Sequence, residues 1–272
     1  MRHANSSFGR RAAVALQQAA SGASNGIAYD EKGYCDDWRA NLQPGLPLDA
    51  IESDFRAGDG NELREKFCAA HSSACLAVNA FRRWRLDPSD LRLGGGCHFR
   101  TLRFEAKMHF GLRRPANLDV LATADTTIVG IESKCLEWIR PKDACFSEAY
   151  EKLRPIHGRT AWFDRLDALR ANPGAYGHVD AAQLVKHALG LASTYPSGDI
   201  QLWYVFWEPV NHSRWEQCGI HREQAHRLAA DVAGDRVQLV PMSHLQLWEQ
   251  WAQNSAQSSS LQYLRSRYWI EV

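Results

Sequence analysis

The stretch from Asn117 to Lys134, NLDVLATADTTIVGIESK, decides the expected fold. It contains two short segments rich in Val, Ile, Leu and Thr, LDVLAT (118–123) and TIVGIESK (127–134), which the compact polar turn ADTT connects. Such residues favour strands, and a polar turn between two such segments is typical of a β-hairpin. We therefore predict an antiparallel hairpin at the centre of the protein.

The turn also predicts which residues of the hairpin face each other. If it is centred between Asp125 and Thr126, cross-strand partners have numbers that add up to 251. Asp119 then faces Glu132, and Lys134 shares their side because side chains alternate with a period of two. A one-residue change in the turn would place Glu132 on the opposite face from Asp119. The other side should pack into a core and is apolar except for Ser133: Leu118, Val120, Ala122, Val129, Ile131 and Cys135.

Two carboxylates on neighbouring strands, with Cβ atoms about 4.5–5.5 Å apart, repel each other unless they share a cation or a proton. Oxygen ligands without supporting Cys or His suit Mg²⁺ or Mn²⁺. Because Mg²⁺ keeps several waters and binds phosphate oxygens, the expected substrate is a phosphate ester. Lys134 is placed to hold or help deprotonate the attacking water and to offset charge on the phosphate.

These residues resemble the motif of the PD-(D/E)XK nuclease superfamily: Asp119, then Glu132-Ser133-Lys134 at the end of an apolar strand. The segments HSSACLAVNAF (71–81) and DAAQLVKHALGLA (180–192) extend the resemblance, more loosely, to bacterial proteins described as restriction endonucleases, over about residues 60–210. The resemblance implies an α/β fold with a restriction-endonuclease-like core, α-β-β-β-α-β, in which helices flank a mixed sheet. No proline precedes Asp119, but the proline of the family name is often absent.

The resemblance also implies roles for the motif residues. Asp119 and Glu132 would bind Mg²⁺, the carbonyl of Ser133 would assist, and Lys134 would act on the attacking water. Many nucleases of this superfamily bring a Gln or a Lys to the site from the second core helix.

The second core helix is expected from Asp180 to Ser193, with Asp180 as its N-cap. Gln183 and Lys186 match the family's Gln or Lys by position, and His187 shares their helix face. The competing interpretation is a solvated helix face.

Glu105 is a candidate third carboxylate. The segment His98–Phe110 alternates enough to be a strand. If the following loop is centred on Leu112, cross-strand numbers add up to 224, and Glu105 faces Asp119. Otherwise Glu105 simply pairs with an arginine. The tripeptide at 105–107, EAK, also fits the E-x-K pattern, but no hairpin-symmetric aspartate accompanies it.

The rest of the sequence predicts the division into domains and the other helices and strands. We predict residues 1–60 as an N-terminal arm and loops, 61–252 as the nuclease domain, and 253–272 as a C-terminal segment that docks on the domain. Within the domain, the expected helices are 62–84, 148–153, 162–171, 221–232 and 244–251, and the expected strands are 200–207 and 237–240. Glu62 and Glu65 would favour a helix start or add acid to the metal site.

The composition fits a globular protein of the cytoplasm. The seven cysteines show no CxxC pairing, which favours reduced thiols, and no apolar run reaches the length of a membrane span. The net charge is only +1, but residues 82–114 hold nine basic and three acidic residues. This excess suits contact with a phosphate backbone, unless the arginines pair with acidic residues elsewhere. The predicted nucleic-acid contacts are Arg82, Arg83, Arg100, Arg103, Lys107, Arg113, Arg114 and Lys186.

We therefore expect a Mg²⁺-dependent nuclease, with Mn²⁺ as a possible substitute, that hydrolyses phosphodiester bonds in nucleic acid, DNA above all. Cleavage of both strands would call for a homodimer. One alternative is a nucleic-acid-binding module with the same fold and no catalytic activity. Another is that Asp119, Glu132 and Lys134 form a surface ion-pair cluster.

Overall fold

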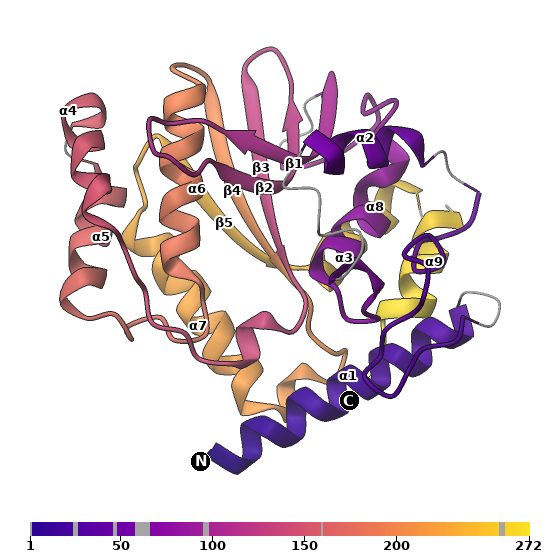
Figure 1. Cartoon of the computed structure of the whole chain (residues 1–272). Coiled ribbons are helices and arrows are strands. Elements are labelled where there is room, and N and C mark those ends of the chain that lie inside the picture. Colours follow the sequence, from indigo (N-terminus) through magenta and orange to yellow (C-terminus); the bar gives the residue numbers. More distant parts are fainter. Residues whose placement is uncertain are drawn as a thin grey trace.

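A five-stranded mixed sheet forms the centre of the protein, in the order β1-β2-β3-β4-β5 (Figure 1). The structure is a computed structural model that describes residues 2–23, 27–45, 48–57, 66–94, 98–158, 160–255 and 259–272. The first three strands form an antiparallel meander, and β4 and β5 run parallel to β3. The strands are β1 Thr101–Met108, β2 Ala116–Thr123, β3 Thr127–Lys134, β4 Asp199–Phe206 and β5 Val237–Ser243.

Both predicted registers are confirmed. Partners in β2 and β3, such as Val120 and Ile131, have numbers that add up to 251. Partners in β1 and β2, such as Ala106 and Leu118, have numbers that add up to 224. The polar turn between β2 and β3 therefore has the even length on which the predicted site depends.

Two groups of helices cover the sheet (Figure 1). α5 and α6 lie on one side, while α3, α8 and α9 lie on the other, and α1 runs along one end against α9. With α3 before the meander and α6 between β3 and β4, the α-β-β-β-α-β core is confirmed. The helices are α1 Arg2–Ala23, α2 Asp49–Ala57, α3 Ser73–Phe81, α4 Arg154–His157, α5 Ala161–Ala171, α6 Ala181–Thr194, α7 Glu216–Asp231, α8 His244–Ser255 and α9 Ser259–Tyr268.

The hairpin is packed closely against α6. A Cβ atom added to Gly130 of β3 would lie 2.8 Å from a methyl group of Leu118 and 2.9 Å from one of Leu191 in α6. The missing side chain at Gly130 therefore lets α6 approach the sheet. This approach brings the N-terminal turns of α6 next to the end of β3.

The predicted N-cap of α6 is confirmed, because Asp180 Oδ1 accepts a hydrogen bond from the Gln183 amide at 3.1 Å. The predicted helix over 62–84 is wrong in its extent. α3 begins after Ser72, whose Oγ accepts a hydrogen bond from the Cys75 amide at 3.1 Å. The polar N-cap at Ser72 fixes where the helix starts, although the apolar periodicity continues before it. The residues before Ser72 include a short 3₁₀ turn, Lys66–Cys68, instead. Glu62 and Glu65 lie outside the described residues.

One hydrophobic core includes side chains from both ends of the chain. Phe8, Ala12 and Leu16 of α1 are fully buried, so the predicted N-terminal arm contributes to the core. Near the other end, the Tyr268 carbonyl accepts a hydrogen bond from Trp207 Nε1 at 2.9 Å. No helix in the described part of the chain is both long and apolar enough to cross a membrane. The six described cysteines are free thiols.

Candidate active site

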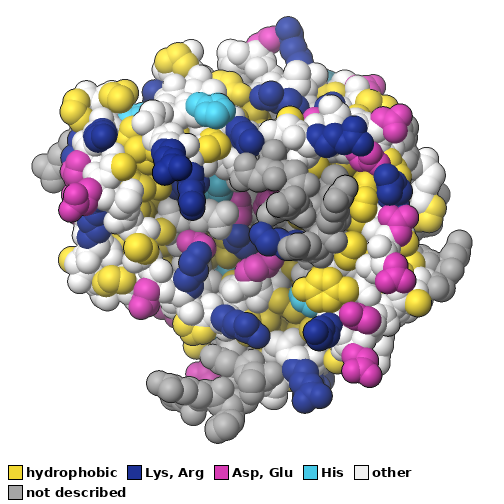
Figure 2. Space-filling model, in the orientation of Figure 1, with side chains coloured by type: hydrophobic (Ala, Val, Ile, Leu, Met, Phe, Trp, Pro, Cys, Tyr) yellow, Lys and Arg dark blue, Asp and Glu magenta, His cyan; other side chains and the backbone are white. Residues whose placement is uncertain are grey.

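Four of the predicted site residues line one cleft with a volume of about 980 Å³. They are Asp119 of β2, Glu132 and Lys134 of β3, and Gln183 of α6. In Figure 2, basic side chains surround a hollow near the centre of the face shown, and acidic side chains are visible inside it. The sheet and α6 therefore bring together residues that are up to 64 positions apart in the sequence.

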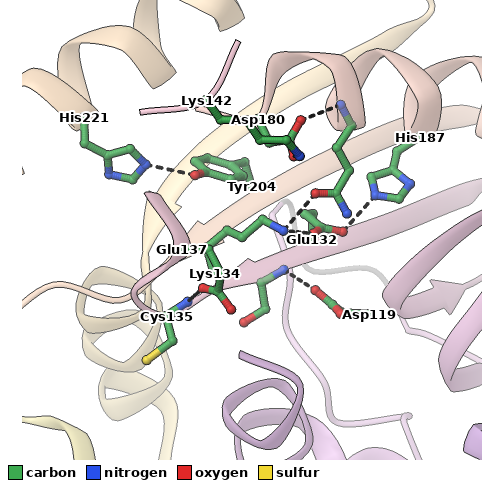
Figure 3. Close-up of polar contacts among 12 residues, drawn as sticks. Asp119, Glu132, Lys134, Cys135, Glu137, Lys142, Asp180, His187, Tyr204 and His221 are labelled. Carbon is green, nitrogen blue, oxygen red and sulfur yellow. Dashed lines mark hydrogen bonds and ion pairs between the residues drawn. The ribbon is translucent and has the colours of Figure 1, made fainter. Parts of the chain in front are cut away.

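Lys134 links the two sides of this site (Figure 3). Its Nζ atom donates to Glu132 Oε1 at 2.5 Å and to Gln183 Oε1 at 2.8 Å. Burial alone would lower the pKa of Lys134, but the attraction of Glu132 and Asp119 outweighs burial and raises that pKa above its usual range. Lys134 is therefore an ammonium group, which acts toward a water or a phosphate oxygen as a hydrogen-bond donor.

Glu132 is held between two basic side chains. Its Oε2 atom lies 2.8 Å from His187 Nε2 of α6, on the other side of the carboxylate from Lys134 (Figure 3). Burial opposes ionisation of Glu132, but Lys134 and His187 outweigh this effect and lower its pKa. The Glu132 side chain is only 3% exposed, so its ion pair with Lys134 lies inside the protein and not on its surface.

Asp119 lies where the β2–β3 ladder ends. The last paired residues are Val120 and Ile131, and Asp119 Oδ2 then accepts a hydrogen bond from the Ser133 amide at 2.7 Å. Burial raises the pKa of Asp119 well above its usual range, and the nearby carboxylates of Glu132 and Glu105 raise it further. The positive charge near Asp119, mainly that of Lys134, is therefore too small to offset the cost of ionising this buried carboxyl.

The side chain of Ser133 faces away from Asp119. Its Oγ atom lies 3.0 Å from Nε2 of the buried His244 in α8. The predicted contribution of Ser133 to a metal site thus rests on its carbonyl alone.

Glu105 does not join the site as predicted. The register places it opposite Asp119, but it is absent from the residues that line the cleft. Its φ of 47° is the one positive value found among the described non-glycine residues. Even so, β1 keeps its alternation of buried and more exposed residues and its register with β2 on both sides of Glu105. Across the described ranges, no three His, Cys, Asp or Glu side chains form a set that could hold a metal ion.

The donor chemistry of the remaining pair fits one hard divalent cation. Asp119 and Glu132 provide carboxylate oxygens without a thiol ligand, and such oxygens suit Mg²⁺ or Mn²⁺. Glu132 Oε2 makes the ion-pair contact with His187 but no well-directed hydrogen bond. A cation would also neutralise the repulsion that raises the pKa of Asp119.

None of the eight basic residues predicted to bind nucleic acid lines the cleft. The prediction is wrong for Arg82, which is 4% exposed and donates a hydrogen bond to the Gln43 carbonyl inside the protein. Arg83 pairs with Asp90 at 3.1 Å, and Arg100 pairs with Asp125 at 2.5 Å beside the hairpin turn. Pairing with acidic residues thus accounts for part of the local charge. The other five, Arg103, Lys107, Arg113, Arg114 and Lys186, lie outside the cleft, where their role stays a prediction.

The cleft has other basic residues, which the sequence did not point out. Arg10 of α1 and Arg140 line it and are exposed, and the described part of the chain contains no acidic partner for either of them. Lys66 and His71 also line the cleft. Arg10, Lys66 and His71 come from segments far from the hairpin in sequence, and Arg140, shortly after the end of β3, belongs to no recognisable motif.

His187 is a further residue that sequence reasoning missed. A signal for it was available: His187 is four positions after Gln183, so both side chains lie on one face of α6. The sequence predicts that shared face but assigns His187 no role, although Gln183 and His187 contact the same carboxylate-lysine pair.

Comparison with known proteins agrees with this fold. The family model REase-ARP, described as restriction endonuclease associating with ARP, matches residues 13–269. Searches of curated proteins and of solved structures found no match. Because the family model covers almost the whole chain, we conclude that this protein belongs to the REase-ARP family, which is restriction-endonuclease-like.

Proposed function

We propose that this protein is a metal-dependent nuclease that hydrolyses phosphodiester bonds, with DNA as its main substrate. The observation that carries the proposal is the convergence of Asp119, Glu132, Lys134 and Gln183 on one cleft. The family agrees with a nuclease function at a coarser level. The exposed basic residues of the cleft, Arg10 and Arg140, supply positive charge that suits a phosphate backbone.

Asp119 and Glu132 would hold the cation, with help from the Ser133 carbonyl. When bound, Mg²⁺ or Mn²⁺ would polarise the phosphate and lower the pKa of a water molecule. The remaining chemistry falls to side chains of the chain itself.

Lys134 would position the attacking water and neutralise charge that develops on the phosphate. Its Nζ atom is held by Glu132 and Gln183, so the ammonium group is oriented before the substrate arrives. Gln183 contacts Lys134 through its side chain and is therefore a positioning residue.

Plasmid cleavage tests the proposal. Supercoiled DNA is incubated with the wild-type protein and with Lys134→Ala, in Mg²⁺, in Mn²⁺ and in a chelator. We expect nicked circles from the wild type in either metal, and at least about 100-fold slower nicking by Lys134→Ala. Linear product formed together with nicked circles would indicate that two copies act on one duplex.

Lys152→Ala is the matched control, because Lys152 is exposed on the surface and does not line the cleft. It should nick like the wild type. Equal background nicking by all three proteins, together with retained DNA binding, would instead support a binding module without catalytic activity.

A further inference from the structure

An exposed aromatic ring lies in the wall of the cleft. Tyr34 is 40% exposed, and it is the one large aromatic side chain with such exposure among the described residues. It lines the same cleft as Glu132 and Lys134. An aromatic ring left open to solvent inside a cleft has an apolar face available for a ligand.

The backbone around Tyr34 is held on both sides. The Tyr34 amide donates to Asp30 Oδ1 at 2.8 Å, and the Tyr34 carbonyl accepts from the Asp30 amide at 2.8 Å. On the other side, Tyr34 forms a β-bridge with Ala69, and the Cys35 amide donates to the Cys68 carbonyl at 3.0 Å. The backbone that carries the ring is therefore held in place before a ligand binds.

The ring of His71 packs against the ring of Tyr34. His71 meets Tyr34 edge to face, with ring centroids 6.4 Å apart. Burial lowers the pKa of His71, so its imidazole is neutral near pH 7. The surroundings of Tyr34 thus suit an uncharged aromatic ligand.

The charges of the cleft suit a phosphate chain alongside that ring. Arg10 and Arg140 are exposed in the cleft and have no ion-pair partner in the described ranges of the chain. The Lys134 side chain is only 13% exposed, so a substrate must enter the cleft to reach it. At about 980 Å³, the cleft is of the size that usually takes small ligands, about 300–1,000 Å³. An unpaired strand fits such a space better than a base-paired duplex does.

We propose that Tyr34 is a stacking platform for a nucleobase, and that the strand cleaved at Lys134 enters the cleft unpaired. This inference rests on the proposed nuclease function and names its substrate class: single-stranded DNA, or DNA with locally unpaired bases. Proteins that bind single strands combine a basic groove with aromatic side chains on which bases stack. Here the basic groups are Arg10 and Arg140, and the aromatic group is Tyr34.

Fluorescence anisotropy with labelled oligonucleotides tests this assignment. A 12-nucleotide single strand and a hairpin duplex of matched length are titrated with the full chain in a chelator, so that neither is cleaved. We expect the wild type to bind the single strand at least about tenfold more tightly. Tyr34→Ala should bind the single strand about tenfold more weakly and the duplex almost unchanged, and Tyr34→Trp should retain tight binding.

Leu86→Ala is the control, because Leu86 is 68% exposed and does not line the cleft. Thermal melts of all variants show whether each one is folded. The assignment is overturned if folded Tyr34→Ala binds the single strand like the wild type, if Tyr34→Trp loses as much affinity as Tyr34→Ala, or if the wild type binds neither probe.

The two proposals can fail separately. Plasmid nicking without any effect of Tyr34→Ala on single-strand binding would overturn the platform alone. Single-strand binding that depends on Tyr34, without metal-dependent cleavage of any substrate, would overturn the nuclease alone.

Discussion

His187 Nε2 lies 2.8 Å from Glu132 Oε2, and both residues are at most 2% exposed. A buried carboxylate that loses a partner retains the full penalty of its burial. His187→Leu should therefore lower the free energy of unfolding by about 1–3 kcal/mol. Urea denaturation measures this loss.

His226→Leu is the control for that substitution, since His226 is exposed on α7. Its free energy of unfolding should change by less than about 0.5 kcal/mol. Equal stability of His187→Leu and the wild type would show that Lys134 alone compensates the charge of Glu132.

Asp119→Asn should stabilise the metal-free protein while it removes the response to metal. The amide keeps an oxygen that can accept the Ser133 hydrogen bond, and it removes the charge that Glu132 and Glu105 repel. We expect a gain of at least about 1 kcal/mol without metal. With Mg²⁺ at 100 times its Kd, the wild type should gain about 2.7 kcal/mol, and Asp119→Asn much less.

Thermal melts with and without Mg²⁺ measure both effects of Asp119→Asn. Asp125→Asn, at the exposed hairpin turn, should respond to Mg²⁺ like the wild type. A wild-type melting temperature that is unaffected by both Mg²⁺ and Mn²⁺ would contradict a cation site at Asp119 and Glu132.

Gln183→Leu should slow cleavage without weakening substrate binding. The substitution removes the amide oxygen that accepts from Lys134 Nζ, whereas the N-cap bond of α6 uses the Gln183 backbone amide and stays. We expect kcat to fall about tenfold with little change in KM, because a positioning contact acts on the reacting geometry. Steady-state kinetics on a labelled oligonucleotide separates the two constants.

Gln238→Leu, an exposed position on β5, is the control for Gln183→Leu and should keep the wild-type kcat. Gln183→Glu retains an acceptor for Lys134 and should recover part of the rate. A change in KM alone for Gln183→Leu would assign Gln183 to substrate binding.

At position 105, unlike most strand positions, we expect glycine to give a more stable protein than alanine. At its φ of 47°, glycine avoids the steric penalty of a side chain, about 1–2 kcal/mol. Glu105→Gly should therefore be more stable than Glu105→Ala, although both remove the same charge. At Lys107, where φ is not positive, glycine should instead be less stable than alanine by about 0.5–1 kcal/mol. Urea denaturation measures the stability of all four variants. If alanine is more stable than glycine at both positions, the backbone strain at Glu105 is refuted.

Stability should fall in acid because of His221. This residue is fully buried, its Nε2 atom lies 2.9 Å from the Tyr204 hydroxyl, and its ring stacks on Trp138 at 4.4 Å. Burial, followed by the charges of His178 and Arg222, lowers the pKa of His221 to about 3. In the unfolded chain the pKa of a histidine is about 6.5.

The unfolded chain therefore binds a proton between these two pKa values, while the folded protein does not. The stability that is present above about pH 6.5 decreases as the pH falls toward 3, by on the order of 3 kcal/mol from this residue at pH 4. His221→Gln should flatten the dependence of urea denaturation on pH between 7 and 4. His226→Gln, at an exposed position of the same helix, should leave it unchanged. Equal slopes for His221→Gln and the wild type would contradict this assignment.

The sequence by itself determined the hairpin and the first half of the site. The even turn between Asp125 and Thr126 fixed the register, and the register placed Asp119 near Glu132 and Lys134. Alternation along strands and the N-cap of α6 are local properties, so they can be read without knowledge of the rest of the fold. The expected position of Gln183 followed from the same kind of pattern together with the family resemblance.

Tertiary structure alone decided which residues surround Asp119, Glu132 and Lys134. Arg10 of α1 and Tyr34 of the loop after it line the same cleft as Arg140, which follows β3 in sequence. Arg82, which the sequence presents as one of a basic cluster, is buried instead. Charge counts and periodicity describe neighbours along the chain, whereas burial and contact between distant segments depend on how the whole core packs. For that reason the sequence identified the residues proposed to carry the chemistry, and the folded structure identified those proposed to hold the substrate.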